Sequence, residues 1–586
     1  MKNCAEAIET AVRVEPHRDD AWLAGVWKRE DGGGLFTVNQ DLSFAASFLI
    51  PNPATSSPPY IEAHIEGKLD ASNPELLCDP AVGLYQYELR NIMSPGGDSL
   101  FGNAAAIEYV PVTLKAGAGG FVLSADLIAA AAFLGGSNPV FTRQDPGPGA
   151  NGAGADVVDG ASDKVSAGGA AGEVLVPRDV AGVNHSGYFG VPDMEYAFLD
   201  ELGVSWVHRD FSWDSIERSD DSWNFADFDR YVQEANARGK KVLGMLLYDV
   251  PWVHAVTGGT TRSISAEEIP YFVDYAKKTV ERYNGKNGFG KVDGWCIWNE
   301  PNIERFWLGS PGEFGVLSAA TARALKEDID SGGALILGGV FAPYIDERWI
   351  RSIFESGAME FCDGIAFHPY SFTAAGAAAV FNAFKEKVAP YGFADKIWIN
   401  EIGYPAVDYP ALYHSIRYGT ETPEPLMPET TVKTFASLAA GGAKMVMWYH
   451  LFDGSRRADG DPEAWFGLLW PGPEGMVKKG GYWAYALCAR HLAGMTWKPG
   501  AFPHDTIDGV EFYYFEDRVK RTLIIWNNSY VSSASLRLTI RGKNRLIHNI
   551  STGGSEQITA DTTTVTLGAQ YRPAQDSLLF ITWEDR

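Results

Sequence analysis

The chain has 586 residues, of which 46% are hydrophobic and 21% are charged, a composition typical of soluble globular proteins and not of disordered, collagenous or coiled-coil chains. It carries 49 Lys and Arg against 74 Asp and Glu, and the formal net charge of −25 disfavours nucleic acid and anionic membrane surfaces as partners. At about 150 residues per domain the length allows about four domains, or fewer if one of them is a large barrel. Aromatic residues make up 13% of the chain, which suits an enzyme acting on a neutral ligand with flat apolar faces.

The five cysteines are widely spaced and include no C-x-x-C pair, so we expect free thiols and neither a disulfide framework nor a zinc ribbon. Free thiols favour a reducing compartment. The N-terminal sequence MKNCAEAIETAVRVEP lacks the apolar core of a signal peptide, so we expect a cytoplasmic protein, with secretion left open if a leader has been removed. The longest apolar run, residues 121–134, contains Asp126 and is too short to span a bilayer.

Residues 1–143 contain short stretches of β character broken by clusters of Pro, Asn and Ser, a pattern that predicts a β-rich accessory domain. Residues 144–179 are expected to form a linker or loop, since residues 144–172 include 8 Gly and 7 Ala and few large apolar side chains. A formal G-x-G-x-x-G begins at Gly147. It lacks the flanking strand and helix of a dinucleotide site, so no cofactor is expected.

From residue 180 to 495 short apolar β-type runs alternate with amphipathic helical stretches, which indicates a parallel sheet. The predicted strands are residues 182–188, 204–208, 241–247, 294–298, 334–338, 364–367, 396–400 and 444–448. Eight units in this length predict an α/β fold of the (β/α)8 (TIM) barrel type; a doubly wound sheet also alternates but does not require eight units. Residues 496–586 are again strand-rich, at 510–515, 522–526, 536–540 and 577–583, and predict a C-terminal β-sandwich.

Two predicted strands end in an Asn-Glu pair, Trp-Asn-Glu-Pro-Asn at 298–302 and Trp-Ile-Asn-Glu-Ile-Gly-Tyr at 398–404. In such barrels the active site lies at the C-terminal ends of the strands, so Glu300 on strand four and Glu401 on strand seven are expected to face each other. Two carboxyl groups at a barrel mouth suit glycosidic bond cleavage; the alternative for either one is a surface or ion-paired residue. The 11 His show no H-x-H or H-E-x-x-H spacing and no G-x-S-x-G is present, so we expect neither a metal site nor a serine hydrolase.

The 298–302 segment resembles the W-N-E-P-N signature on strand four of clan A retaining glycoside hydrolases, and the 398–404 segment resembles their strand seven. The resemblance covers residues 180–495 and is closest to family 39, the β-xylosidase and α-L-iduronidase group that also cleaves exopolysaccharides, with family 5 next. It implies that Glu300 is the general acid/base, that Glu401 is the nucleophile and that Asn299 binds the sugar 2-hydroxyl. The implied reaction is retaining hydrolysis of β-linked glycosides of plant or microbial polysaccharides and oligosaccharides. The alternative is a non-catalytic carbohydrate-binding protein on a glycosidase-like barrel, which would be expected to lack one glutamate.

Other candidates follow strands six and two. The sequence His368-Pro-Tyr370 follows strand six. The resemblance implies that Tyr370 keeps Glu401 ionised. His368 is either a site residue or a structural histidine. Arg209 resembles the strand-two arginine that orients the nucleophile, with a local ion pair as the alternative.

Three tryptophans are candidate sugar platforms, because the C–H faces of sugars stack on aromatic rings. Trp448 ends strand eight, where the family carries a tryptophan under the sugar, and Trp252 and Trp307 follow strands three and four. Core packing is the alternative for each of them. The terminal β-domains either bind glycan or brace the barrel, since a fold does not by itself specify function.

Overall fold

The computed structural model describes the backbone of eight strands between residues 25 and 143, and residues 172–184, 192–343, 345–371, 373–407, 422–423, 427–454, 462–472, 475–504, 507, 509–528, 533–568 and 577–585. The chain divides into two compact units, and the second begins at Gly169. Each unit is considered by itself.

The first unit contains a closed antiparallel barrel in which each strand pairs with the next and β1 pairs with β8. In the cross-strand register Trp27 pairs with Phe36 and Phe36 with Ala46, while Lys28 pairs with Leu35 and Leu35 with Ser47. The predicted β-rich N-terminal domain is confirmed. Its strands are β1 (Gly25–Arg29), β2 (Gly34–Val38), β3 (Ser43–Pro51), β4 (Tyr60–Asp70), β5 (Leu84–Met93), β6 (Tyr109–Gly117), β7 (Gly120–Ala125) and β8 (Val140–Arg143).

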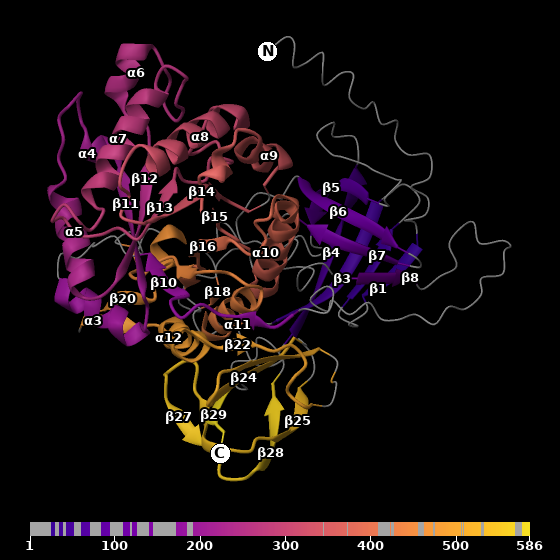
Figure 1. Ribbon diagram of the computed structural model, residues 1–586. Helices are drawn as coiled ribbons and strands as arrows, with labels where there is room; N and C mark the ends of the chain where they lie inside the picture. Colours follow the sequence, from indigo (N-terminus) through magenta and orange to yellow (C-terminus); the bar gives the residue numbers. More distant parts are fainter. Residues whose placement is uncertain are drawn as a thin grey trace. The chain divides into compact units, whose positions relative to one another are not determined.

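The second unit is built around a closed parallel barrel, ordered β10-β11-β12-β13-β14-β15-β16-β19 (Figure 1). The barrel strands are β10 (Ala181–Asn184), β11 (Trp206–Ser212), β12 (Lys241–Leu247), β13 (Gly294–Ile297), β14 (Leu335–Phe341), β15 (Gly364–Phe367), β16 (Ile397–Ile402) and β19 (Val446–Trp448). The predicted (β/α)8 barrel is confirmed. Of the first predicted strand, residues 185–188 lie outside the described residues.

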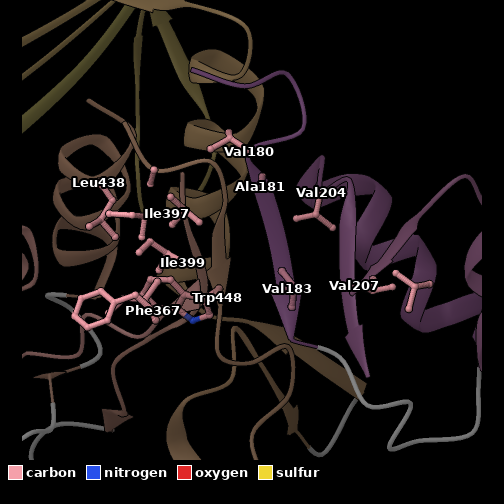
Figure 2. Packing of buried hydrophobic residues seen from close by; sticks show 14 of the residues in the cluster. Val180, Ala181, Val183, Val204, Val207, Phe367, Ile397, Ile399, Leu438 and Trp448 are labelled. Atoms are coloured by element: carbon pink, nitrogen blue, oxygen red, sulfur yellow. The ribbon is translucent and has the colours of Figure 1, made fainter. Parts of the chain in front are cut away.

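The helices surround the barrel (Figure 1). Side chains alternate between its interior and its outer wall along each strand. Met245, Cys296 and Leu337 belong to the inner apolar cluster, whereas Ile297 packs outward. Val207 and Ile399 also pack outward and are labelled in Figure 2. The α-helices are α3 (Pro192–Leu202), α4 (Trp213–Ile216), α5 (Ala226–Ala237), α6 (Pro251–Thr257), α7 (Ile269–Arg282), α8 (Pro311–Glu327), α9 (Glu347–Glu355), α10 (Ala374–Val388), α11 (Met427–Ala440) and α12 (Gly480–Leu492). Single-turn 3-10 segments occur at η3 (Ala358–Glu360), η4 (Ala389–Tyr391) and η7 (Pro462–Trp465).

The C-terminal region forms a seven-stranded sheet, ordered β27-β26-β29-β24-β23-β22-β9, and a two-stranded sheet of β25 and β28. Both faces of β24 are apolar: Leu523 and Ile525 pack with the two-stranded sheet, and Ile524 and Trp526 join the barrel core. The predicted β-sandwich is confirmed, and it is packed against the barrel. Its strands are β9 (Val174–Leu175), β22 (Thr496–Trp497), β23 (Val510–Glu516), β24 (Lys520–Asn527), β25 (Ala534–Thr539), β26 (Lys543–His548), β27 (Ser555–Gln557), β28 (Thr562–Leu567) and β29 (Leu578–Glu584).

Strand β9 lies within the stretch expected to be a linker, and it pairs with β22, so the end of that stretch belongs to the second unit. Residues 144–171, including the G-x-G-x-x-G at Gly147, lie outside the described residues. Two short strand pairs lie outside the barrel sheet. In one, β17 (Ala406–Val407) pairs with β18 (Thr422–Pro423), and in the other, β20 (Leu469–Gly472) pairs with β21 (Gly475–Lys478).

The cysteines in the described part of the chain are free: Cys296 and Cys488 are buried and Cys362 is half-buried. Cys4 and Cys78 lie outside the described residues. None of the described helices combines the length and the apolar character needed to cross a bilayer.

Candidate active site

Glu300 is held just beyond the end of β13 by an unusual local backbone. Trp298 and Glu300 both adopt positive φ, 65° and 43°, a region uncommon for residues other than glycine and often found at functional sites. The Trp298 Nε1–H donates to the carbonyl of Phe306 at 3.2 Å. Asn302 donates to the carbonyl of Ala342, at 3.2 Å, and accepts from its amide, at 3.0 Å. The Trp-Asn-Glu-Pro-Asn segment therefore fixes the glutamate between the ends of strands four and five.

Glu401 lies near the end of β16, on the seventh strand of the barrel. The end of the neighbouring strand β19 is joined to β16 by a hydrogen bond from the Tyr449 amide to the carbonyl of Ile402, at 2.9 Å. A Cβ atom at Gly403 would overlap the carbonyl oxygen of Tyr449, so this position requires glycine for the close approach. The Glu-Ile-Gly sequence thus brings strands seven and eight together beside the carboxyl group.

The structure brings four of the predicted residues into one cluster. The Nδ1 atom of His368 is 2.7 Å from Oε1 of Glu300 and 3.9 Å from Oε1 of Glu401. The Tyr370 hydroxyl donates to Oε1 of Glu401 at 2.9 Å. Ligand atoms of Glu300, His368 and Glu401 all lie within 4.8 Å of one another. Two carboxyl groups from strands four and seven thus share a small space, joined through a histidine and a tyrosine that follow strand six.

Electrostatics in this cluster favour the retention of a proton close to neutral pH. Burial, together with the charge of Glu300, raises the pKa of Glu401 to about 7, while His368 and the hydrogen bond from Tyr370 oppose the rise. Burial by itself would lower the pKa of His368, but the charge of Glu401 and the hydrogen bond with Glu300 outweigh it and the net direction is upward. The negative charge of Glu300 therefore disfavours the ionisation of Glu401.

Asn299 lies beside Tyr248, a residue that the sequence did not single out. Its side chain hydrogen-bonds Tyr248, whose pKa is raised by burial and by the charge of Asp210. The ring of Tyr248 stacks on that of Phe306, with centroids 6.0 Å apart, and both rings are half-buried. The signal that was available is the position of Tyr248, directly after the end of β12.

A second aromatic group adjoins the nucleophile candidate and was also missed. Phe466 makes edge contacts with Tyr370 and Tyr449, at centroid distances of 6.2 and 5.4 Å, and all three are half-buried. The segment that carries Phe466 is held by a buried ion pair, in which Lys479 Nζ is 2.6 Å from Asp453 Oδ1. The same carboxyl group accepts a hydrogen bond from the amide of Gly467, at 2.9 Å. No local sequence signal connects Phe466 with the site, because the contact depends on tertiary structure.

Arg209 does not occupy the position expected for a residue that orients Glu401. Its guanidinium carbon lies 5.3 and 5.4 Å from the ring centroids of Phe228 and Tyr231, both on α5 outside the barrel. Residues of a strand alternate in direction, so Asp210 takes the opposite side. The charge of Asp210 acts on Glu401 and on Tyr248 at the barrel mouth. On this strand Asp210, and not the expected Arg209, faces the site.

The neighbouring histidine of β11 is also close to the cluster. His208 is 4% exposed, and its Nε2 lies 3.7 Å from Oδ1 of Asp210. Burial lowers the pKa of His208; the charge of Asp210 opposes this fall and the proximity of His368 adds to it. The net direction favours the neutral form of His208 beside the cluster.

Two of the three tryptophans expected to bind sugar are core residues. Trp448 is fully buried, with its ring 5.9 Å from that of Tyr485 on α12, and Figure 2 shows it among the apolar side chains outside the barrel strands. Trp307 is 2% exposed and packs edge-on against Trp298, with centroids 5.0 Å apart. Neither ring has a free face for a ligand. Trp252 is half-buried, and its Nε1–H donates to the carbonyl of Glu217 at 3.0 Å, so it is tied to the loop after strand two.

Among the described residues, Glu300, His368 and Glu401 are the group whose spacing could hold a metal ion. Binding a cation there would compete with the hydrogen bond between Glu300 and His368 and with that from Tyr370 to Glu401. The cluster is chemically complete as a carboxyl pair with its own partners, and the absence of a metal stays a prediction.

No protein-family model and no curated protein sequence matches the chain. Among solved structures, a family 39 glycoside hydrolase from the gut symbiont Bacteroides cellulosilyticus WH2 is 13% identical, with a TM-score of 0.52 over 95% of this chain and 99% of that chain. A family 30 endoxylanase from Clostridium papyrosolvens C71 is 12% identical, with a TM-score of 0.49 over 71% of this chain and 98% of that chain. A family 5, subfamily 18 enzyme from Streptomyces cattleya in complex with GlcNAc is 18% identical, with a TM-score of 0.42 over 54% of this chain and 81% of that chain. Of these three structures, the family 39 enzyme has a TM-score above 0.5, and at 13% identity its similarity shows the fold alone.

Proposed function

We propose that this protein is a retaining glycoside hydrolase that cleaves β-linked glycosides by double displacement. The observation that carries the proposal is the carboxyl pair of Glu300 and Glu401, which lies at the ends of strands four and seven with oxygen atoms within 4.8 Å. Retaining enzymes hold their carboxyl groups about 5–5.5 Å apart, whereas inverting enzymes need about 6.5–9.5 Å to admit a water between them. The spacing here supports the retaining arrangement.

In the first step the carboxylate of Glu401 attacks the anomeric carbon, and the bond from that carbon to the leaving oxygen breaks. Glu300 donates its proton to the leaving oxygen, which departs as an alcohol. In the second step Glu300, now ionised, removes a proton from water, and the resulting hydroxyl displaces Glu401 from the anomeric carbon. The sugar is released with its original configuration, and both carboxyl groups return to their starting states.

The neighbouring groups supply the charge control that this sequence of steps requires. The mechanism requires Glu401 to be ionised when the substrate binds. The charge of His368 and the hydrogen bond from Tyr370 both lower the pKa of Glu401 and so favour its ionised form, against the effect of burial. When Glu401 becomes an ester its negative charge disappears, so an ionised Glu300 no longer faces a neighbouring carboxylate. Glu300 is then able to act as a base toward water.

Half-buried polar and aromatic groups around the pair suit a neutral sugar. We assign Asn299 to the sugar 2-hydroxyl, with Tyr248 as the residue that orients its amide. Tyr449 and Phe466 form an aromatic edge beside Glu401 on which a sugar ring can rest. They take the role that the sequence had given to Trp448.

A screen of aryl xylosides, glucosides, galactosides and arabinofuranosides first identifies a substrate. The acid/base role of Glu300 is then tested with a Glu300→Ala variant, whose activity is compared on substrates with good and poor leaving groups. We expect the variant to lose about 10²- to 10⁴-fold on a glycoside with a poor leaving group, the range supplied by general acid catalysis. It should remain active on a dinitrophenyl glycoside, and azide should restore turnover and give the β-glycosyl azide. Equal losses on both substrates, with no azide product, would remove Glu300 from the acid/base role.

The second candidate function is that of a non-catalytic carbohydrate-binding protein. A folded sample that binds glycans but hydrolyses no aryl glycoside or oligosaccharide would establish it. For the domains, we propose that residues 1–143 form an accessory module and that residues 496–586 brace the barrel. The burial of Ile524 and Trp526 of β24 in the barrel core supports the bracing role.

A further inference from the structure

Helix α6, which follows strand three of the barrel, carries a histidine outside the Glu300–Glu401 cluster (Figure 1). This residue, His254, is 9% exposed, and each of its ring nitrogens faces a carboxyl group. Its Nδ1 is 2.7 Å from Oε1 of the fully buried Glu268, and its Nε2 is 2.8 Å from Oδ2 of Asp249. The three side chains form one hydrogen-bonded group, the Asp249–His254–Glu268 triad.

The geometry of this triad indicates its charge state. A carboxylate can only accept hydrogen bonds, so a ring nitrogen that faces one must donate. Because both nitrogens of His254 face carboxyl groups, the ring carries a proton on each and is positively charged. Burial by itself lowers the pKa of His254, but the hydrogen bonds with Asp249 and Glu268 outweigh it and the net direction is upward. Burial also opposes the ionisation of Glu268, but the hydrogen bonds that it accepts bring its pKa below the usual value.

The charged groups around His254 come from the segments on either side of α6. Asp249 precedes the helix and Glu268 directly precedes α7, while α6 itself carries no other charged side chain. The loop between the two helices adds Arg262, whose guanidinium donates to the carbonyl of Glu304 at 3.2 Å.

Other side chains of α6 contact the loop after strand two and helix α7. Trp252 donates to the carbonyl of Glu217 at 3.0 Å and packs edge-on against Tyr271 of α7, with centroids 5.8 Å apart. The carboxyl group of Glu217 accepts from Trp213 Nε1, at 2.8 Å. Among the described residues, the charges that act on the histidine are therefore those of its two carboxyl partners.

The triad holds the loop between α6 and α7 in an uncommon conformation. Arg262 has a φ of 59°, in a region rarely occupied by residues other than glycine. Its amide donates at 2.9 Å to Oδ2 of Asp249, the same oxygen that faces His254. Nearer α7, Oε2 of Glu268 accepts from the Ser265 amide at 2.7 Å. Each carboxyl group of the triad therefore binds the loop as well as the histidine.

The loop is joined in turn to the segment that follows strand four. The Leu308 amide donates to the carbonyl of Arg262 at 2.6 Å, and this bond and the guanidinium bond to Glu304 lie on either side of Phe306 in the chain. The ring of Phe306 stacks on that of Tyr248, the residue assigned to orient the amide that binds the sugar 2-hydroxyl. A release of the loop would therefore disturb the sugar-binding side of the barrel mouth.

We propose that the Asp249–His254–Glu268 triad is a pH-sensitive latch on the loop of residues 258–268. The loop is held while His254 is protonated and is released when His254 gives up a proton to solvent. A neutral imidazole donates through one nitrogen and turns a lone pair toward the other carboxylate, so one charge-assisted hydrogen bond is replaced by a repulsive contact. His254 is a positioning residue, because it acts on the site through the loop. The effect on substrate rests on the proposed function, whereas the latch itself does not.

The direction of the pH effect follows from the shift of the histidine. Because the pKa of His254 is raised in the folded chain, the latch is fully held below the ordinary value of 6.5 and is lost as the pH rises through the folded value.

Hydrogen–deuterium exchange of the full-length chain tests the latch, with mass spectrometry of peptides that cover residues 258–268 and correction for the intrinsic pH dependence of exchange. The titration of His254 is followed in parallel by NMR, with its signal assigned from its loss in His254→Gln. We expect these amides to exchange about 10- to 100-fold faster above the His254 midpoint than below it, the effect of one hydrogen bond to a charged group. In His254→Gln, which cannot bind both carboxylates as a cation, exchange should be fast at every pH.

Asp249→Asn keeps an acceptor oxygen but removes its charge, so it should lower the midpoint of His254 by about 1–3 pH units and the midpoint of loop exchange with it. His504→Gln is the matched control, since His504 is an exposed histidine of the C-terminal region, and it should move neither midpoint. Loop exchange that does not depend on pH, or that does not follow His254 in Asp249→Asn, would overturn the inference.

The effect on the site is measured with a glycoside that the protein hydrolyses. KM should rise with pH at the midpoint of loop exchange, and this rise should move to lower pH in Asp249→Asn. A loop that follows His254 while KM does not would refute the coupling to the site. A loop that follows His254 in a chain without hydrolytic activity would refute the proposed function and leave the latch standing.

Discussion

Replacing the half-buried carboxyl group of Glu401 should stabilise the protein in a pH-dependent manner. Burial and the charge of Glu300 raise the pKa of Glu401 from its usual 4.5 to about 7 in the folded chain. A carboxyl group with a raised folded pKa binds its proton more tightly in the folded state. Its contribution to stability is therefore present at low pH and is lost as pH rises from about 4.5 through about 7. Glu401→Gln removes this loss, because the amide carries no charge at any of these pH values.

The size of the effect follows from the two pKa values. At about 1.4 kcal/mol for each pH unit between 4.5 and about 7, the ionised side chain costs the folded protein at most about 3 kcal/mol at pH 8. At pH 5 the folded carboxyl group is protonated and the cost falls below about 1 kcal/mol. The variant should thus gain about 2 kcal/mol more at pH 8 than at pH 5.

Urea unfolding at both pH values, with the midpoint and slope measured for each chain, tests this expectation. Glu355→Gln on the exposed surface of α9 is the matched control and should show no such difference. A gain for Glu401→Gln that is equal at pH 5 and pH 8, or a loss at pH 8, would refute the electrostatic reasoning for the pair.

Three further predictions concern other parts of the account. Tyr370→Phe removes the hydrogen bond to the Glu401 carboxylate. We expect kcat/KM on an aryl glycoside to fall about 10- to 100-fold at neutral pH, and the acidic limb of the pH profile to move to higher pH. An acidic limb that does not move would contradict the role of Tyr370 in keeping Glu401 ionised. Lys479→Met leaves the buried Asp453 without its cation and should cost about 3–5 kcal/mol in urea unfolding, which a change below about 1 kcal/mol would disprove. Trp307→Leu should lower the unfolding temperature and leave KM unchanged, because the ring is core; a raised KM with normal stability would return it to the binding site.

The strands of the barrel, and the positions of Glu300 and Glu401 at strand ends, could be predicted because both depend on the pattern of residues close together in the sequence. Each barrel strand is a brief apolar run with a defined end. Pro301 directly follows Glu300 at one of those ends, and Gly403 lies two residues after Glu401 at another. Once eight such units are counted, the barrel places Glu300 and Glu401 at one mouth, since all strands run in the same direction.

The direction of individual side chains could not be predicted in the same way. Arg209 and Asp210 are adjacent, so only one of them can face the barrel, and the choice depends on a register that the local sequence does not reveal. Trp448 and Trp307 have the residue type of a sugar platform, but their surroundings are apolar and bury them. Phe466 reaches the site only through tertiary structure, held by a distant ion pair.

The central claim is that Glu401 is the nucleophile of a double displacement, and covalent trapping tests it most directly. The chain is incubated with an activated 2-fluoro glycoside of the sugar that it hydrolyses, digested, and examined by mass spectrometry. We predict a single 2-fluoroglycosyl group on the peptide that contains residues 398–404, attached to Glu401, with loss of activity in proportion to labelling. Attachment to another residue, or full activity in Glu401→Gln, would contradict the account.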